Sequence, residues 1–261
     1  MEKILTICTG KYFARSDQDD INELDRYEKQ LSYLKKHKYH MIGCYLKAFG
    51  NGHDLYKQCI ENLVNKPILN YKEQFKRVCD GSNIAGCTIF AETNILKKFK
   101  PFKKEYGLAE DWYLYSILHK NNCKIGILNE TLYNYRVHKK NNSMEYTSRK
   151  KLIPQFYEVI FRYFYIDTIS KYKNVLFFKR LEEELIIKPI FNKYLSNINC
   201  KFVNEYNIKD FLVNEMENYN SKNTIIFIGT KFYNTLNPFI VNKEFVMYEN
   251  LIPLMDCYFV K

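Results

Sequence analysis

A short alternating stretch that runs directly into three carboxylates constrains this chain more than any other part of its sequence. The stretch reads Gly10-Lys11-Tyr12-Phe13-Ala14-Arg15-Ser16-Asp17-Gln18-Asp19-Asp20. Two sets of side chains alternate from Tyr12 to Ser16, and this period of two predicts a short strand. Asp17 and Asp19 stand two residues apart, so at the end of a strand their side chains point to the same side of the backbone. We therefore expect a strand that presents paired carboxylates at its carboxyl end.

Two converging carboxylates suit a hard divalent cation. Mg²⁺ and Mn²⁺ prefer oxygen ligands and usually take one or two protein carboxylates, while water and substrate phosphates fill the other positions. Asp20 has a second expected role, because Asp20 and Glu23 have the spacing of a capping box that opens a helix. The alternative is that all three aspartates form a solvated turn and a helix cap.

The composition of the chain excludes disorder and restricts its partners. Apolar residues make up 46% of the 261 residues, which is enough for a hydrophobic core. The formal net charge of +11 admits nucleic acid, an anionic membrane surface or a phosphorylated small molecule. The basic residues are spread in short runs and no nucleic-acid-binding motif accompanies them, so we expect no nucleic-acid partner. The alternative reading of the charge is a soluble basic surface.

The cysteines and the lack of targeting signals predict a cytoplasmic protein. The eight cysteines contain no C-x-x-C pair and no zinc spacing, and no signal peptide is visible, so we expect reduced thiols. No apolar run approaches the roughly 20 residues that a bilayer-spanning helix needs. We expect a protein that is soluble, or peripheral at the inner face of the membrane.

Helix and strand patterns alternate over the first 148 residues. Helical spacing predicts helices over about 24–36, 54–64, 93–99 and 110–121, and apolar runs predict strands over about 41–49, 124–128 and 131–138. A loop that begins at residue 81 leads into a further buried strand. In the strand 131–138, the side chains of Arg136 and His138 share one face. This order predicts an α/β core over residues 1–148.

The remaining residues predict a helical extension over 149–222 and a small α/β tail over 223–261. An aromatic helix with basic flanks covers about 152–169, and a second helix covers about 177–195. Apolar runs at 223–229 and 244–248 predict strands. The aromatic helix suits peripheral contact with a membrane. The alternative is that it packs against the core.

Three separated clusters carry candidate chemistry: Asp17 with Asp19, Glu110 with Asp111, and Arg136 with His138. Each has a plain structural alternative. Acidic residues complement the macrodipole in the first turn of a helix, and a single arginine or histidine most often serves the surface or the packing. The order and spacing of the three clusters favour a common site.

In that order the clusters resemble the inverting family-2 glycosyltransferases of the A-type fold. The resemblance runs from about residue 10 to residue 143. It rests on the stretch 10–20 quoted above, on Ala109-Glu110-Asp111-Trp112, and on Tyr135-Arg136-Val137-His138 with Ser143. The segment 81–102 also looks like the acceptor-side loop, strand and helix of that family. The resemblance implies a mixed sheet flanked by helices.

The resemblance also implies a role for each matching residue. Asp17, Asp19 and His138 would hold Mg²⁺ or Mn²⁺. Arg136 and Asp20 would bind the donor diphosphate. Glu110 and Trp112 would lie on the acceptor side, and residues 139–143 would form a flap over the donor.

Asp111 matches the general base of the family. It would take the proton from an acceptor hydroxyl while that oxygen attacks the anomeric carbon of a nucleotide-diphosphate sugar, with inversion. A glycan or a lipid-linked molecule is the expected acceptor.

One departure from the family concerns the residues ahead of Asp17. Only sixteen residues precede it, whereas the family begins with a nucleotide-binding half that includes a Pro-x-Tyr-Asn loop and an aspartate for the nucleobase. We expect a truncated or split enzyme, with a partner chain that supplies the missing half. The alternative is a non-catalytic fragment or pseudoenzyme that binds a partner chain or a glycan.

Overall fold

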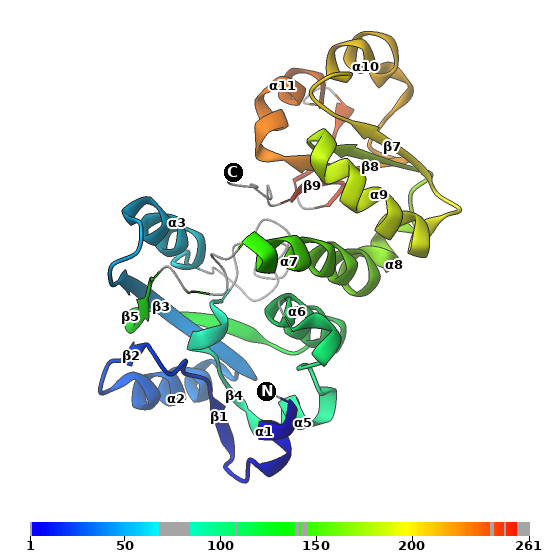
Figure 1. Cartoon of the computed structure of the whole chain (residues 1–261). Coiled ribbons are helices and arrows are strands. Elements are labelled where there is room, and N and C mark those ends of the chain that lie inside the picture. The colour runs from blue at the N-terminus through cyan, green and yellow to red at the C-terminus, as the bar shows by residue number, and fades with distance from the viewer. Residues whose placement is uncertain are drawn as a thin grey trace. The chain divides into compact units, whose positions relative to one another are not determined.

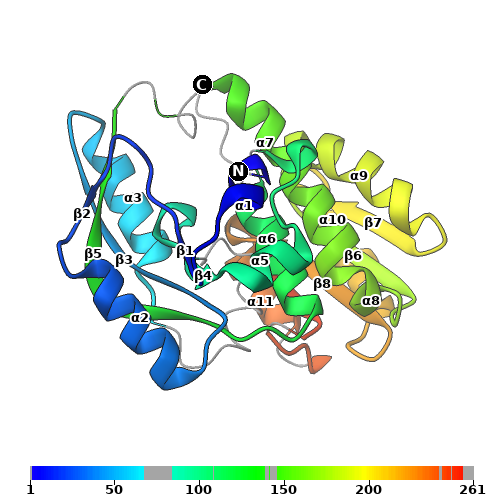
Figure 2. The ribbon, with the colours of Figure 1, turned by 90° about the horizontal axis from the view of Figure 1, so that it is seen from below.

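The computed structural model describes residues 2–67, 84–107, 109–138, 141, 146–240, 243–247 and 249–254. The chain divides into two compact units, residues 1–149 and 150–261. Each unit contains one sheet with helices packed on it (Figures 1 and 2). The two units are described separately below.

The first unit is built on a five-stranded mixed sheet. Its strands follow the order β1 (Tyr12–Ala14), β4 (Phe90–Glu92), β3 (Met41–Phe49), β5 (Ile125–Arg136) and β2 (Ile21–Asn22). The long strands β3 and β5 run parallel, whereas β1, β4 and β2 pair antiparallel with their neighbours. The helices are α1 (Glu2–Ile7), α2 (Arg26–His37), α3 (Asp54–Val64), α5 (Thr93–Phe99) and α6 (Glu110–Lys120), with short 3₁₀ turns η2 (Gly86–Thr88) and η3 (Lys104–Tyr106). The predicted α/β class with a mixed sheet and flanking helices is confirmed.

The predicted helix over about 24–36 is confirmed as α2, but it begins at Arg26 and its buried face is more polar than its apolar spacing indicated. Leu24 lies ahead of the helix at 105% relative exposure, and Tyr27 is 43% exposed. The buried positions are instead Arg26, Gln30 and Leu34. Two of these three side chains are polar, so they need hydrogen-bond partners inside the unit.

Strand β5 is one strand, although the sequence predicted two, over 124–128 and 131–138. It pairs with β3 along its whole length, and the register shifts on either side of Tyr45. Residues 129–131 at this irregularity are exposed. A bulge of this kind adds a residue to one strand without ending the ladder, so the break in the apolar pattern marks a bulge and not a turn.

The second unit is a parallel α/β sheet. Its strands follow the order β7 (Asn199–Val203), β6 (Asn174–Phe178), β8 (Thr224–Gly229) and β9 (Leu251–Leu254), all parallel. Helices α9 (Leu181–Leu195), α10 (Ile208–Asn214) and α11 (Thr230–Ile240) connect successive strands. Ahead of the sheet, α7 (Tyr146–Val159) continues through a π-helical segment (Ile160–Tyr165) into α8 (Ile166–Ile169).

This sheet corrects the predicted organisation of the carboxyl-terminal half. Residues 149–222 are not a purely helical extension, because they contain β6 and β7. Residues 223–261 are not a separate tail, because β8 pairs with β6 in the same sheet. The last two residues of β6, Phe177 and Phe178, were included in the predicted helix 177–195, which in fact begins at Leu181. The strand expected at 244–248 is replaced by β9, and Met247 makes only an isolated bridge to Leu251.

Aromatic rings form the centre of the second unit. Phe161 packs edge to face against Phe177, Phe191 and Phe227, with its ring centroid 5.5–5.9 Å from theirs, and all four rings are fully buried. Phe161 belongs to the aromatic helix for which the sequence suggested membrane contact. Its ring is enclosed by other rings of its own unit, so this part of the aromatic face is not offered to a membrane. Among the described residues, the helices are too short or too polar to cross a bilayer.

Removing the Phe161 ring is expected to destabilise the protein strongly. Phe161→Ala leaves a cavity among rings that cannot all move into it, and such changes cost about 3–5 kcal/mol of unfolding free energy. Phe239→Ala is the matched control, because Phe239 is 39% exposed in α11 and its loss should cost less than about 1 kcal/mol. Urea unfolding followed by circular dichroism measures both. Equal effects of the two substitutions would contradict the packing described here.

Candidate functional site

The carboxylate-bearing turn is held between two antiparallel strand pairs of the first sheet. It connects β1, where Phe13 pairs with Ala91 of β4, to β2, where Ile21 pairs with Asn134 of β5. The two strands are only three and two residues long. The turn between them carries all three predicted aspartates. The sequence therefore placed the carboxylates correctly at the end of a strand.

Asp19 brings together the residues that the sequence assigned to one strand face. The Nε2 atom of His138 lies 2.9 Å from Oδ2 of Asp19, and the Nε atom of Arg136 donates to the Asp19 carbonyl at 2.7 Å. The hydrogen bond from His138 is the main cause that lowers the pKa of the Asp19 carboxyl below its ordinary value. Arg136 also lies over the Phe49 ring, 4.4 Å from its centroid. Asp19, Arg136 and His138 thus form one polar cluster beside the turn.

Asp20 fixes the turn and does not cap a helix. Its Oδ2 accepts a hydrogen bond from the Tyr133 hydroxyl at 2.6 Å, and its Oδ1 accepts one from the Arg136 backbone N–H at 2.7 Å. The Tyr133 oxygen in turn accepts the Asp17 N–H at 3.0 Å. The predicted capping box is therefore wrong: helix α2 begins only at Arg26. Burial raises the pKa of both Asp20 and Tyr133.

Arg15 connects the turn to the acidic start of α6. Its Nε lies 3.3 Å from Oδ1 of Asp17, and its Nη1 lies 2.5 Å from Oε1 of Glu110 and 3.8 Å from Oδ1 of Asp111. The arginine was not among the predicted site residues. The available signal was its position two residues before Asp17, which puts both side chains on the same side of the strand end.

Asp111 is the carboxylate with the most perturbed ionisation in the site. Partial burial raises its pKa to about 6, against the lowering influence of the Arg15 guanidinium, while Glu110 and Asp17 raise it further. The backbone N–H of Gly86 binds the carboxylate, and the side chain remains 32% exposed. A carboxylate with a pKa near 6 that still reaches solvent is suited to take up a proton near neutral pH.

Gly86 is required by the closeness of its backbone to Asp111. A Cβ atom at this position would lie 2.5 Å from Oδ1 and 2.6 Å from Oδ2 of Asp111. The 3₁₀ turn η2 that holds Gly86 is attached to α6, because the Tyr115 hydroxyl of α6 donates to the Ile84 carbonyl just ahead of the turn. The glycine lets the peptide N–H reach the carboxylate directly.

Of the other predicted residues, Trp112 is described by the structure and several are not. Trp112 is half-buried in the first turn of α6, and its carbonyl accepts a hydrogen bond from the Ser116 hydroxyl at 2.7 Å. Ser143, residues 81–83 and most of the expected flap 139–143 lie outside the described residues.

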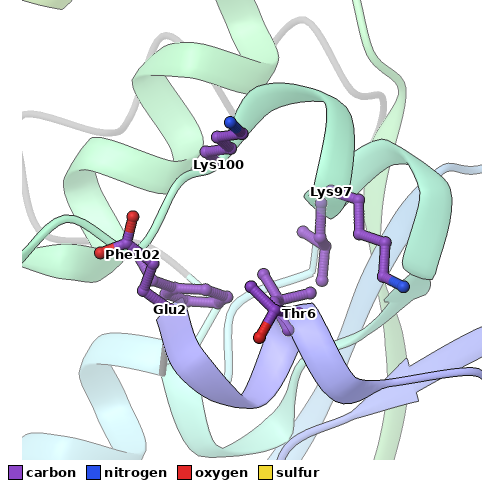
Figure 3. Close-up of a pocket in the computed structure, with 7 residues that line it drawn as sticks. Glu2, Thr6, Lys97, Lys100 and Phe102 are labelled. Carbon is purple, nitrogen blue, oxygen red and sulfur yellow. The ribbon is translucent and has the colours of Figure 1, made fainter.

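A separate cavity of about 360 Å³ lies between α1 and α5 (Figure 3). Its lining contains none of the predicted site residues; it consists of Glu2, Leu5, Thr6, Leu96, Lys97, Lys100 and Phe102.

The donor set at the turn fits a hard divalent cation that shares its ligands with a substrate. The side chains of Asp17 and Asp19 are 40% and 39% exposed, and both offer carboxylate oxygens. In the described part of the chain, no three His, Cys, Asp or Glu side chains are grouped to hold a metal by themselves. Mg²⁺ commonly binds through one or two carboxylates and completes its coordination with phosphates and water. A cage made only of protein ligands is therefore not needed.

Comparison with known proteins gives one relative and several solved structures. No protein-family profile matches the chain. A curated Haemophilus influenzae protein described as an uncharacterized glycosyltransferase is 30% identical over 152 residues, which are 53% of this chain and 44% of that protein. The chain thus spans less than half the length of this relative.

Crystal structures of S. aureus TarS are among the solved structures that the chain resembles. A crystal structure of its residues 1–349 with UDP-GlcNAc is 12% identical with a TM-score of 0.43, over 76% of this chain and 60% of that chain. The same part of TarS with UDP is 14% identical with a TM-score of 0.40, over 82% of this chain and 53% of that chain. This chain therefore covers less than two thirds of each.

Loss of the Arg15 charge is expected to raise the pKa of Asp111 above 6. Arg15→Gln removes the cation that favours the ionised carboxylate, while Glu110 and Asp17 remain and continue to favour the protonated form. A carboxyl-carbon NMR titration of Asp111 measures the change. Lys11→Gln is the control, because it removes the same charge from the same segment without changing a neighbour of Asp111. An unchanged or lower pKa in Arg15→Gln would show that Arg15 does not act on Asp111.

Alanine at Gly86 and alanine at Gly107 are expected to have effects of opposite sign. Gly86→Ala forces a methyl group into the Asp111 carboxylate and should destabilise the protein by about 1–3 kcal/mol. Gly107 has a φ of −54°, and a Cβ there would lie 3.5 Å from the Lys104 carbonyl, an ordinary contact. Gly107→Ala should therefore stabilise by about 0.4–1 kcal/mol through the unfolded chain. Urea unfolding decides the signs.

Proposed function

We propose that the chain is the metal-binding and acceptor-side part of an inverting family-2 glycosyltransferase of the A-type fold. The observation that carries this proposal is the position of Arg15, which contacts Asp17 of one predicted cluster and Glu110 of another. Asp19 gathers the third cluster, Arg136 and His138, at the same turn. The similarity to a glycosyltransferase over about half of the chain supports the same assignment.

Asp111 would act as the general base. With a pKa of about 6, its carboxyl is mostly ionised at neutral pH and able to accept a proton. It would take the proton from an acceptor hydroxyl as that oxygen forms a bond to the anomeric carbon of the donor. The bond from this carbon to the diphosphate oxygen breaks in the same step, which inverts the configuration. Gly86 and Arg15 hold the carboxylate in place for this proton transfer.

Asp17, Asp19 and His138 would hold Mg²⁺ or Mn²⁺ together with the donor diphosphate. When bound, the cation would neutralise the charge that develops on the departing nucleotide diphosphate. Arg136 lies beside Asp19 and would contact the same diphosphate. Asp20 was predicted to bind the donor, but both of its oxygens are hydrogen-bonded to Tyr133 and Arg136. We therefore assign Asp20 to the positioning of the turn.

The partners of the proposed reaction follow from the same assignment. The donor would be a nucleotide-diphosphate sugar, and the acceptor a glycan or a lipid-linked molecule that meets Glu110 and Trp112 at the start of α6. The reaction would take place in the cytoplasm.

Metal-dependent nucleotide binding tests this function directly. Isothermal calorimetry of the purified chain with UDP, GDP and dTDP should show binding of one of them that requires Mn²⁺. The double variant Asp17→Asn/Asp19→Asn should lose that binding, because it removes two anionic ligands. Asp25→Asn is the matched control, since Asp25 pairs with Lys29 on the surface and should leave binding unchanged. Asp111→Asn should keep nucleotide binding and lose sugar transfer.

Two results would contradict the proposed function. A folded chain that binds no nucleotide in the presence of Mn²⁺ would overturn the proposal that this polypeptide holds a donor by itself. Binding that survives the double variant would show that the cation is held elsewhere.

A further inference from the structure

Arg26 is a fully buried arginine whose guanidinium donates hydrogen bonds to neutral groups. Its exposed fraction is 0%. Nε donates to Oε1 of Gln30 at 3.0 Å, Nη1 donates to Oδ1 of Asn22, and Nη2 donates to the carbonyls of Arg15 at 2.9 Å and Cys87 at 3.2 Å. Among the described residues it makes no ion pair with a carboxylate. A buried charge without a counter-charge is costly, and here neutral hydrogen-bond acceptors alone offset that cost.

The two carbonyls that Arg26 binds belong to the two halves of the candidate site. The Arg15 carbonyl lies at the start of the turn that carries Asp17, Asp19 and Asp20. The Cys87 carbonyl lies in η2, one residue after the glycine whose N–H binds Asp111. The neighbouring Gln30 repeats the second link, because its Nε2 donates to the Thr88 carbonyl at 2.9 Å. The buried face of α2 therefore holds both segments at once.

A third contact of Arg26 reaches the carboxylate turn through Tyr133. The guanidinium carbon lies 4.7 Å from the centroid of the Tyr133 ring. The hydroxyl of this ring accepts the Asp17 N–H and donates to Asp20. The forked guanidinium thus supports the turn at its main chain and at the side chain that orders it. Lysine offers a single point charge and cannot reproduce this arrangement.

We propose that Arg26 is a positioning residue that fixes the separation between the Asp17–Asp20 turn and Asp111. Arg26 binds main-chain carbonyls next to both groups of acids and not the carboxylates themselves. The role of those acids in sugar transfer rests on the proposed function. The hydrogen bonds by which Arg26 joins the two segments do not depend on it. Arg26 then serves the geometry of the site in addition to any contribution it makes to the stability of the fold.

Amide hydrogen exchange in two variants tests this proposal. Arg26→Met fills most of the volume without the hydrogen bonds, and Arg26→Lys keeps the charge. In Arg26→Met the amides of Asp17 and Gly86 should exchange at least about tenfold faster, because both segments lose their common anchor. The amide of Ile127 in β5 should respond much less, although the midpoint of urea unfolding should fall because the buried acceptors of Arg26 lose their donor. Arg26→Lys should show the same local effect, and it decides the matter if the methionine variant does not fold.

Two results would overturn the proposal. Unchanged exchange at Asp17 and Gly86 in a folded variant would show that Arg26 does not position them. Equally faster exchange at Ile127 would show a general stabilising role.

Calorimetry of nucleotide binding distinguishes a failure of this proposal from a failure of the proposed function. If the unaltered chain binds UDP with Mn²⁺, Arg26→Lys should weaken that binding by about tenfold while binding still requires the metal. If the unaltered chain binds no nucleotide, the proposed function fails, and the exchange measurement still decides the role of Arg26.

Discussion

The convergence of like charges is the constraint on which the first unit depends. Asp17, Glu110 and Asp111 reach the same place from β1 and α6, and three carboxylates brought together repel one another. The Arg15 guanidinium lies against all three, so the site can assemble in the protein alone. Its attraction does not cancel the burial of Asp111, whose pKa stays near 6. One arginine thereby permits a cluster of acids and leaves one of them ready to exchange a proton.

The long parallel pair β3 and β5 provides the frame for this cluster. Strand β5 continues past its bulge to Arg136, and it places Tyr133 and Arg136 opposite the carboxylate turn. The turn is short and has few backbone bonds of its own, so its shape is set from outside. Side chains of β5 order it on one side, and α2 orders it on the other. The site thus forms where the rigid β3–β5 pair contacts a turn that has little rigidity by itself.

Local patterns predicted the elements well and the polar contacts in part. Alternation correctly put Arg136 and His138 together, and helical spacing located α3 and α6. The partners of Asp20 lie more than 110 residues away along the chain, so its spacing to Glu23 suggested a cap where none exists. Arg26 and Gln30 were missed because a polar residue on a buried face has no periodic signal. In the second unit, β6 is buried on both faces, so its residues do not alternate, and the strand was missed with its last two residues assigned to the helix that follows.

Strand β1 is three residues long and lies at an edge of its sheet, where it pairs only with β4 among the described residues. Edge strands of this length open more easily than the centre of a sheet. The turn with Asp17 and Asp19 is attached to this strand at one end and to β2 at the other. Opening of β1 would therefore loosen the Asp17 end of the turn while β3 and β5 stay paired. The local stability of the site is then a separate property from the global stability of the fold.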